Sequence, residues 1–301
     1  MRHLLSIQDL SEDDIKWIIR KTAELKKNPK ERNYMEKRVL ALIFEKPSTR
    51  TRISMSVAMH NLGGAFIVLN PSDLQLGRGE TAGDTARTLS GYVDFIAARV
   101  NSHRTLEELR DNSTIPVINL LSDMEHPCQA LGDLFTIAEK FGKFRGVAFV
   151  GDGNNNVTHS LLLLCSKLGI NISVGCPKEY EPNEKILEKA RKNAKKYGSH
   201  VIVTNDPVTA VKEEDIIYTD TWVSMGRTDV KKRLELLQPY QVNERLAAHA
   251  KKDYAFMHCL PAHRGHEVTE GIMDGRHSIV WPQAENRLYS AMAILLFLSR
   301  K

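Results

Sequence analysis

The feature that most constrains the fold of this 301-residue sequence is an alternation of short apolar runs with longer helical patterns. A capping pair, Ser11 and Asp14, opens an expected helix that ends near Lys27. The nearly continuous apolarity of the runs that follow is typical of parallel strands covered on both faces. In the first half, the expected strands are Val39–Phe44, Ala65–Leu69, Phe95–Val100 and Pro116–Leu121, and the expected helices are Thr49–Asn61, Thr81–Tyr92 and Thr105–Asp111.

The alternation begins again after a long helix predicted over His126–Phe141. The second set comprises strands Gly146–Val150, Ile170–Gly175, Val201–Thr204, Ile216–Thr219 and Ala255–Leu260, helices Asn156–Leu168, Asn183–Tyr197 and Asn243–Ala250, and a final helix Ala284–Ser299. Two such sets predict an α/β protein of two doubly wound domains with mainly parallel sheets, linked by long helices. We expect one domain over residues 1–130, with the C-terminal helix 285–301 packing back on it, and another over residues 131–284.

Composition excludes several classes of protein. Hydrophobic residues make up 42% of the chain and charged residues 26%, which is ordinary for a globular protein. The formal net charge of +5 is too mild to indicate nucleic-acid binding, but it suits small anionic substrates. Four cysteines without CxxC pairs or zinc-ligand spacing are expected to be reduced thiols. The start of the sequence lacks a signal-peptide core, and Ala291–Leu298 is too short to span a bilayer, so we expect a cytoplasmic protein without a membrane partner.

The sequence PSTRTR at residues 47–52 follows the first predicted strand and opens a helix. Ligands of open α/β sheets bind beyond the carboxyl ends of the strands. The N-terminus of a helix favours an anion, and hydroxyl and guanidinium donors fit the geometry of phosphate. Helix capping beside surface arginines would be the alternative explanation. So many donors within five residues favour a phosphate site.

Two motifs together, STRTR at residues 48–52 and HPCQ at residues 126–129, resemble the carbamoyl-phosphate motifs of aspartate and ornithine carbamoyltransferases. The resemblance implies that His126 and Gln129 hold the carbamoyl group and that Arg99 contacts phosphate and carbonyl oxygens. It also implies that Gln75 lies in a loop that reaches into a neighbouring subunit's active site. Alone, Arg99 would be read as a surface arginine. The implied carbamoyl-phosphate site comprises Ser48, Thr49, Arg50, Thr51, Gln75, Arg99, His126, Gln129, Cys259, Leu260 and Arg287.

Three motifs of the second half resemble the ornithine-specific members of the family rather than the aspartate-specific ones. They are GDGNN at residues 151–155, DTWVSMG at residues 220–226 and HCLP at residues 258–261. A carboxylate can pair with a cationic amine, whereas an aspartate site would need extra cations for a second carboxylate. A lone cysteine is most often a buried apolar residue, but the HCLP motif favours a site role for Cys259. The implied ornithine site is Asn155, Asp220, Ser224 and Met225, and the implied catalytic residues are Arg50, Arg99, His126, Asp220 and Cys259.

The resemblance implies a specific reaction and assembly. The carbamoyl group of carbamoyl phosphate would pass to the side-chain amine of ornithine, giving citrulline and phosphate, a reaction of arginine metabolism. The first domain would bind carbamoyl phosphate and the second ornithine. No metal or organic cofactor is expected, because carbamoyl phosphate is already an activated mixed anhydride. The family builds homotrimers, and its biosynthetic and catabolic forms share these motifs.

Three other functions stay open at this stage. A nicotinamide-dependent dehydrogenase would need a third glycine after residues 151–153, but position 156 is Asn156, and the next strand ends at Pro177 rather than at a ribose-binding acid. A non-catalytic anion-binding module would be expected to have degraded motifs. A carbamoyltransferase that acts on putrescine or an acylated ornithine is a closer alternative, because it would share the carbamoyl-phosphate motifs. The SMG sequence at residues 224–226 nevertheless favours free ornithine.

Overall fold

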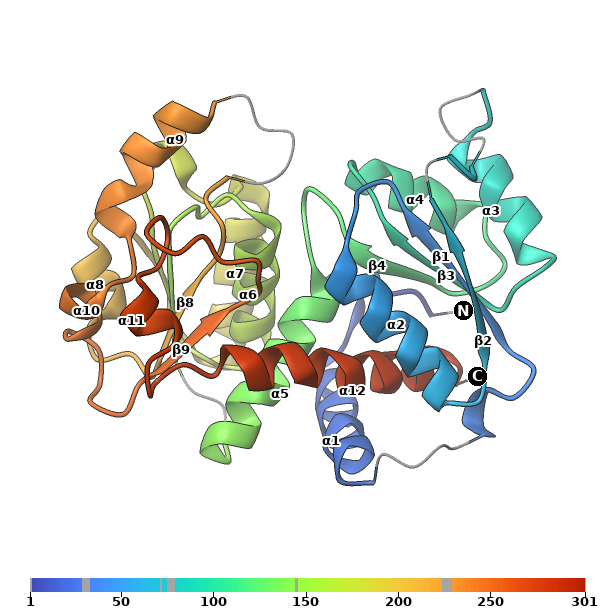
Figure 1. Ribbon diagram of the computed structural model, residues 1–301, viewed down its shortest axis with the longest axis horizontal. Coiled ribbons are helices and arrows are strands. Elements are labelled where there is room, and N and C mark those ends of the chain that lie inside the picture. The colour runs from blue at the N-terminus through green and yellow to red at the C-terminus, as the bar shows by residue number, and fades with distance from the viewer. Residues whose placement is uncertain are drawn as a thin grey trace. The chain divides into compact units, whose positions relative to one another are not determined.

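The chain divides into two compact units, each built around its own parallel sheet. The computed structural model describes residues 2–28, 33–70, 72–74, 79–143, 146–223 and 229–300. Unit 1 is Met1–Phe135 with Asn286–Lys301, and unit 2 is Thr136–Glu285 (Figure 1). The boundaries fall within helices α5 (Pro127–Phe141) and α12 (Val280–Leu298), which continue from one unit into the other.

Unit 1 holds a four-stranded sheet in the order β2-β1-β3-β4, and all its strands are parallel. Each strand lies within one residue of its predicted bounds. The Ser11 hydroxyl and the Asp14 carboxylate cap the first helix reciprocally, as expected. The elements are η1 (Ile7–Asp9), α1 (Glu12–Lys27), η2 (Asn33–Met35), β1 (Val39–Phe44), α2 (Thr49–Asn61), β2 (Ala65–Leu69), α3 (Ala82–Ser90), β3 (Phe95–Arg99), α4 (His103–Asp111) and β4 (Val117–Leu121).

The sheet of unit 1 buries both faces of its inner strands. Ile43 and Ile96 point to the face where they pack with Leu106 and Leu109 of α4. The alternate residues of β1 are buried as well, which explains its continuous apolarity. The prediction that β2 is covered on both faces is wrong. This strand lies at the edge of the sheet with a single neighbour, and its first three residues are exposed.

Unit 2 holds a five-stranded parallel sheet in the order β7-β6-β5-β8-β9. Helices α8, α9 and α11 were not predicted, because they are too short to show a clear helical period. The predicted strand Ala255–Leu260 ends at His258, since Leu260 has a positive φ of 61°. The elements are β5 (Val147–Val150), α6 (Asn156–Lys167), β6 (Ile172–Gly175), η3 (Lys178–Tyr180), α7 (Glu184–Tyr197), β7 (Val201–Thr204), α8 (Pro207–Val211), β8 (Ile216–Thr219), α9 (Val230–Leu237), η4 (Gln238–Tyr240), α10 (Glu244–Ala247), β9 (Ala255–His258) and α11 (Glu270–Met273).

Each sheet has a point at which the chain reverses its direction of winding. In unit 1 this point lies between β1 and β3, and in unit 2 it lies between β5 and β8. Ligands of such sheets bind beyond the carboxyl ends of the strands there, so the loops after these strands are where a site is expected. Within the part of the chain that the structure describes, no helix is long and apolar enough to cross a membrane.

Candidate functional site

The N-terminus of α2 follows β1 at the reversal point of the first sheet. Ser48 is its N-cap residue, but among the described residues its side chain accepts no capping hydrogen bond. Thr49 and Arg50 lie exposed in the first turn. The first N–H groups of a helix lack partners within the helix, and they attract anions. The structure therefore gives this end of α2 the features of an anion site.

Three predicted residues from distant parts of the sequence form one buried cluster in unit 1. The Arg287 guanidinium on α12 donates hydrogen bonds to the Gln129 side-chain oxygen and, at 3.4 Å, to the Thr51 hydroxyl. The Gln129 amide nitrogen donates to the Asp133 carboxylate at 2.8 Å. Asp133 was missed by sequence reasoning, although it lies four residues after Gln129, on the same face of α5. The cluster holds donors and acceptors in fixed positions beside α2.

His126 is buried in the same unit. Its pKa lies well below the usual value, first because of burial and then because of the positive charges of Arg287 and Arg99. Arg99 is the last residue of β3, where the register with β4 shifts. The imidazole is therefore neutral near pH 7, and as a neutral ring it can donate one hydrogen bond and accept another.

The lowered pKa of His126 predicts a pH dependence of stability. Below pH 6.5 the unfolded chain binds a proton at this residue that the folded chain does not bind, so stability falls as pH decreases. The slope should be about 1.4 kcal/mol per pH unit for one proton. Urea unfolding between pH 5 and 7.5 should show a steeper slope in the wild type than in His126→Asn. Equal slopes would contradict the prediction, because contributions from other histidines are common to both proteins.

In unit 2, Asp220 and Cys259 lie together beyond the ends of β8 and β9. The Cys259 thiol donates a hydrogen bond to the Asp220 carboxylate at 2.9 Å, and the Thr221 N–H donates to the same oxygen at 2.7 Å. The strands are parallel neighbours in which Thr219 pairs with His258. Burial raises the pKa of Asp220, whereas the nearby His258 and the thiol hydrogen bond act in the opposite direction.

A buried histidine and glutamate lie behind Cys259. The Leu260 N–H donates to His258 Nδ1 at 2.8 Å, so the proton of a neutral ring lies on Nε2. That nitrogen is 3.3 Å from the Glu267 carboxylate, and both side chains are fully buried. Ligand atoms of Asp220, His258 and Cys259 lie within 4.8 Å of one another, and as residue types they could hold a metal ion. The sequence predicted no metal here.

Asn155 is the N-cap residue of α6. Its side-chain oxygen accepts from the N–H groups of Val157 and Thr158, and its amide donates to the Asp152 carbonyl at 2.9 Å. The predicted contact with ornithine stays a prediction. Arg233, which sequence reasoning missed, is buried and forms an ion pair with Asp152. Three further predicted site residues lie outside the described residues, namely Gln75, Ser224 and Met225.

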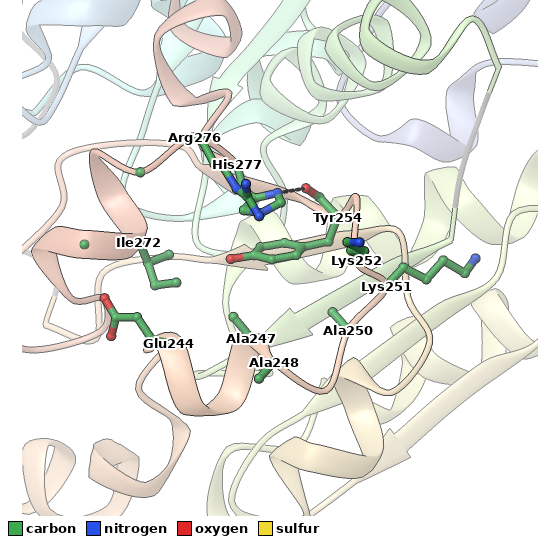
Figure 2. Close-up of a pocket in the computed structure, with 12 residues that line it drawn as sticks. Glu244, Ala247, Ala248, Ala250, Lys251, Lys252, Tyr254, Ile272, Arg276 and His277 are labelled. Carbon is green, nitrogen blue, oxygen red and sulfur yellow. Dashed lines mark hydrogen bonds between the residues drawn. The ribbon is translucent and has the colours of Figure 1, made fainter.

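A cavity of about 370 Å³ in unit 2 lies away from these residues. Figure 2 shows Tyr254 among the residues that line it, and the Tyr254 ring stacks on His277 with ring centroids 4.2 Å apart. Tyr254 directly precedes β9, whereas Cys259 directly follows it. The cavity therefore lies at the amino end of the strand, opposite to the Asp220–Cys259 pair, and it is not the predicted site.

Comparison with known proteins matches both halves of the chain. Residues 2–139 match the family "Aspartate/ornithine carbamoyltransferase, carbamoyl-P binding domain", and residues 145–298 match "Aspartate/ornithine carbamoyltransferase, Asp/Orn binding domain". The anabolic ornithine carbamoyltransferase of Pyrococcus furiosus is 51% identical over 301 residues, covering 98% of this chain and 95% of that protein. The ornithine carbamoyltransferase of Bacillus subtilis is 51% identical over 297 residues, covering 98% and 92%.

Solved structures agree with the sequence comparison. The structure of ornithine carbamoyltransferase from Pyrococcus furiosus is similar with a TM-score of 0.96 and 49% identity, covering 100% of this chain and 98% of that one. The anabolic ornithine carbamoyltransferase from Campylobacter jejuni gives a TM-score of 0.94 and 42% identity, covering 99% of each chain. The similarity therefore extends over both units.

Proposed function

This chain belongs to the aspartate/ornithine carbamoyltransferase family, and from that membership we propose that it transfers the carbamoyl group of carbamoyl phosphate to the side-chain amine of L-ornithine, giving L-citrulline and phosphate. The observation that carries the choice of acceptor is the Asp220–Cys259 pair beyond the strand ends. A carboxylate there attracts an amine and would repel the second carboxylate of aspartate. A biosynthetic direction is supported by the relative from Pyrococcus furiosus, which is named anabolic.

The carbamoyl-phosphate site that we propose lies in unit 1. Ser48, Thr49 and Arg50 would bind the phosphate at the N-terminus of α2, where the cap hydroxyl has no capping bond within the described chain. The buried cluster and its neighbours would bind the carbamoyl group. These residues are Thr51, Arg99, His126, Gln129 and Arg287, with Gln75 as a further contact.

The ornithine site that we propose lies in unit 2. The Asp220 carboxylate, already partnered by the Cys259 thiol, would pair with an amino group of the substrate. Asn155, Ser224 and Met225 would complete the contacts. Cys259 would lie against the substrate, and the proposed reaction does not require it as a covalent nucleophile.

The proposed reaction is a direct acyl transfer. The neutral side-chain amine attacks the carbonyl carbon, which forms a C–N bond and a tetrahedral oxyanion. The oxyanion collapses with cleavage of the C–O bond to the phosphate, and the nitrogen loses one proton, which the departing phosphate can accept. Arg99, His126 and the Thr51 hydroxyl would stabilise the oxyanion, since such preorganised donors act most strongly where charge develops. Arg50 would neutralise the charge on the departing phosphate. The protein supplies binding and electrostatics, because the mixed anhydride is already activated.

An assay of the purified protein tests the proposal. Carbamoyl phosphate would be offered with ornithine, acetylornithine, putrescine and aspartate, and phosphate release and carbamoylated product would be measured for each. We expect the highest kcat/KM with ornithine. A higher value with any of the other three amines would overturn the assignment of the acceptor.

We also propose that the protein is a cytoplasmic homotrimer. Unit 1 exposes apolar side chains on α2 and on the edge strand β2, namely Ile53, Val57, Phe66 and Ile67. Neighbouring subunits of a trimer could cover such exposed apolar side chains. All four cysteines, which lie within the described residues, are free thiols, and this supports a reducing compartment.

A mixing experiment tests whether neighbouring subunits share an active site. If Gln75 serves the site of a neighbour and Arg50 serves its own, then mixing Gln75→Ala with Arg50→Ala, each of which alone has strongly reduced activity, should restore part of the activity. Some sites of a mixed trimer would contain both native residues. Each variant alone, dissociated and reassociated in the same way, is the control. Well-mixed trimers that stay as inactive as the controls would argue against shared sites.

A further inference from the structure

Gln283 is a buried amide near the N-terminus of α12 that no proposed substrate contact uses. Only 1% of the residue is exposed. Its side-chain oxygen accepts a hydrogen bond from the His258 backbone N–H at 2.9 Å, and its side-chain nitrogen donates to the Tyr218 hydroxyl at 3.1 Å. A backbone N–H can only donate, so the amide oxygen must face His258. The orientation of the amide is therefore fixed by chemistry.

The two partners of Gln283 belong to the strands that end at the proposed ornithine site. Tyr218 on β8 lies two residues before Asp220, and His258 is the last residue of β9, directly before Cys259. These strands are parallel neighbours with Thr219 opposite His258. One amide thus connects both strands within two residues of the pair formed by the thiol and the carboxylate.

The place of β9 in the sheet explains why this connection matters. The strand lies at the edge of the sheet, with β8 as its single neighbouring strand. Its outward N–H groups need other acceptors, and the Phe256 N–H finds one in the His277 carbonyl. The His258 N–H, two residues further along, points the same way, and Gln283 accepts it. Gln283 therefore accepts the last outward-facing N–H of β9, directly before Cys259.

We propose that Gln283 is a positioning residue, whose amide sets the spacing and orientation of Asp220 and Cys259 for the amine substrate. The inference rests on the proposed function of that pair. It goes beyond it by assigning a role to a residue outside the substrate contacts. Asp220, Cys259 and Gln283 belong to unit 2, as do the two hydrogen-bond partners of Gln283, His258 and Tyr218.

The first test is Gln283→Met, which keeps the size of the side chain and removes both hydrogen bonds. Without these bonds the ends of β8 and β9 lose the connection that holds Asp220 and Cys259 in place, so we expect the KM for ornithine to rise about tenfold or more and kcat to fall. The dissociation constant of carbamoyl phosphate, measured by calorimetry, should stay unchanged. Gln238→Met, at an exposed glutamine of the same unit, is the matched control.

A second readout does not depend on activity. Of the four cysteines, all within the described residues, Cys259 is partly exposed and the others are buried. Alkylation of Cys259 by iodoacetamide, followed by mass spectrometry, reports on the thiol's hydrogen bond to Asp220. We expect a severalfold faster reaction in Gln283→Met than in the wild type and the control.

Two further variants separate positioning from a merely structural role. In Gln283→Glu, burial favours the protonated carboxylic acid, whose C=O can accept from the His258 N–H and whose O–H can donate to the Tyr218 hydroxyl, so KM should return close to the wild-type value. Tyr218→Phe removes the bond from the Gln283 amide nitrogen but keeps the bond to the His258 N–H, and it should raise KM by a smaller factor. If Gln283→Met does not fold, Tyr218→Phe becomes the deciding variant. An unchanged KM for ornithine in Tyr218→Phe then overturns the inference.

The outcomes distinguish the two proposals. A wild-type protein that does not carbamoylate ornithine overturns the proposed function, while the alkylation rates still test whether Gln283 controls the pair. A wild-type KM and alkylation rate in Gln283→Met, even with a lowered melting temperature, overturns the positioning role. A raised KM with faster alkylation, restored by Gln283→Glu, supports it.

Discussion

Replacing Arg50 by alanine is expected to lower kcat/KM for carbamoyl phosphate about hundredfold, which corresponds to ~2.7 kcal/mol of lost transition-state stabilisation. Arg50 lies in the first turn of α2, where the Ser48 side chain leaves the helix N-terminus without a capping bond among the described residues. A guanidinium there can stabilise the negative charge that develops on the departing phosphate. Steady-state kinetics with carbamoyl phosphate as the varied substrate would measure the loss.

Arg52 provides the matched control for Arg50. It lies two residues further along the same helix, but its guanidinium donates to Asn70 at 2.5 Å and stacks over the Phe44 ring. Because its contacts are with the protein, Arg52→Ala should retain most of the turnover and lose mainly stability. Equal losses of kcat/KM in both variants would show that Arg50 has no special place in the phosphate site.

Replacing Asp220 by asparagine is expected to raise the KM for ornithine and to lower kcat/KM about hundredfold. The substitution keeps the shape of the side chain but removes the charge that would pair with an amine, and losing one partner of a partly buried ionic contact typically costs about 2–5 kcal/mol. The raised pKa of Asp220 adds a dependence on pH. As pH falls through that pKa, the carboxylate is protonated, and the affinity of the wild type for ornithine should decrease toward that of the variant.

Asp215 is the matched control on the same strand. It directly precedes β8, at the opposite end from Asp220, and it forms an ion pair with Lys251 at 3.0 Å. Asp215→Asn should therefore leave the KM for ornithine unchanged, whatever it does to stability. If Asp220→Asn had the same KM for ornithine and the same kcat/KM as the wild type, the Asp220 carboxylate would not be part of the ornithine site.

The order of strands and helices follows from the sequence because its causes are local. Each inner strand is a short apolar run, since parallel strands bury both faces, and the structure places the strands of unit 1 within one residue of the predicted bounds. The phosphate-binding motif is also local, because its hydroxyls and guanidiniums stand within five residues after β1. The exposed strand β2 has the same apolar pattern as the inner strands although it lies at the edge of the sheet.

Only the tertiary structure decides which polar side chains become buried partners over long separations. Arg287 meets Gln129 across 158 positions and Thr51 across 236. Nothing in the sequence around Gln283 and Arg233 singles them out, and polar residues usually face solvent. Their burial depends on which strands become neighbours in the folded sheet. The spacing of apolar residues in a helix or strand shows which face of that segment is buried. The hydrogen bonds that orient a site form between residues of distant segments, and only the packing of those segments brings the partners together.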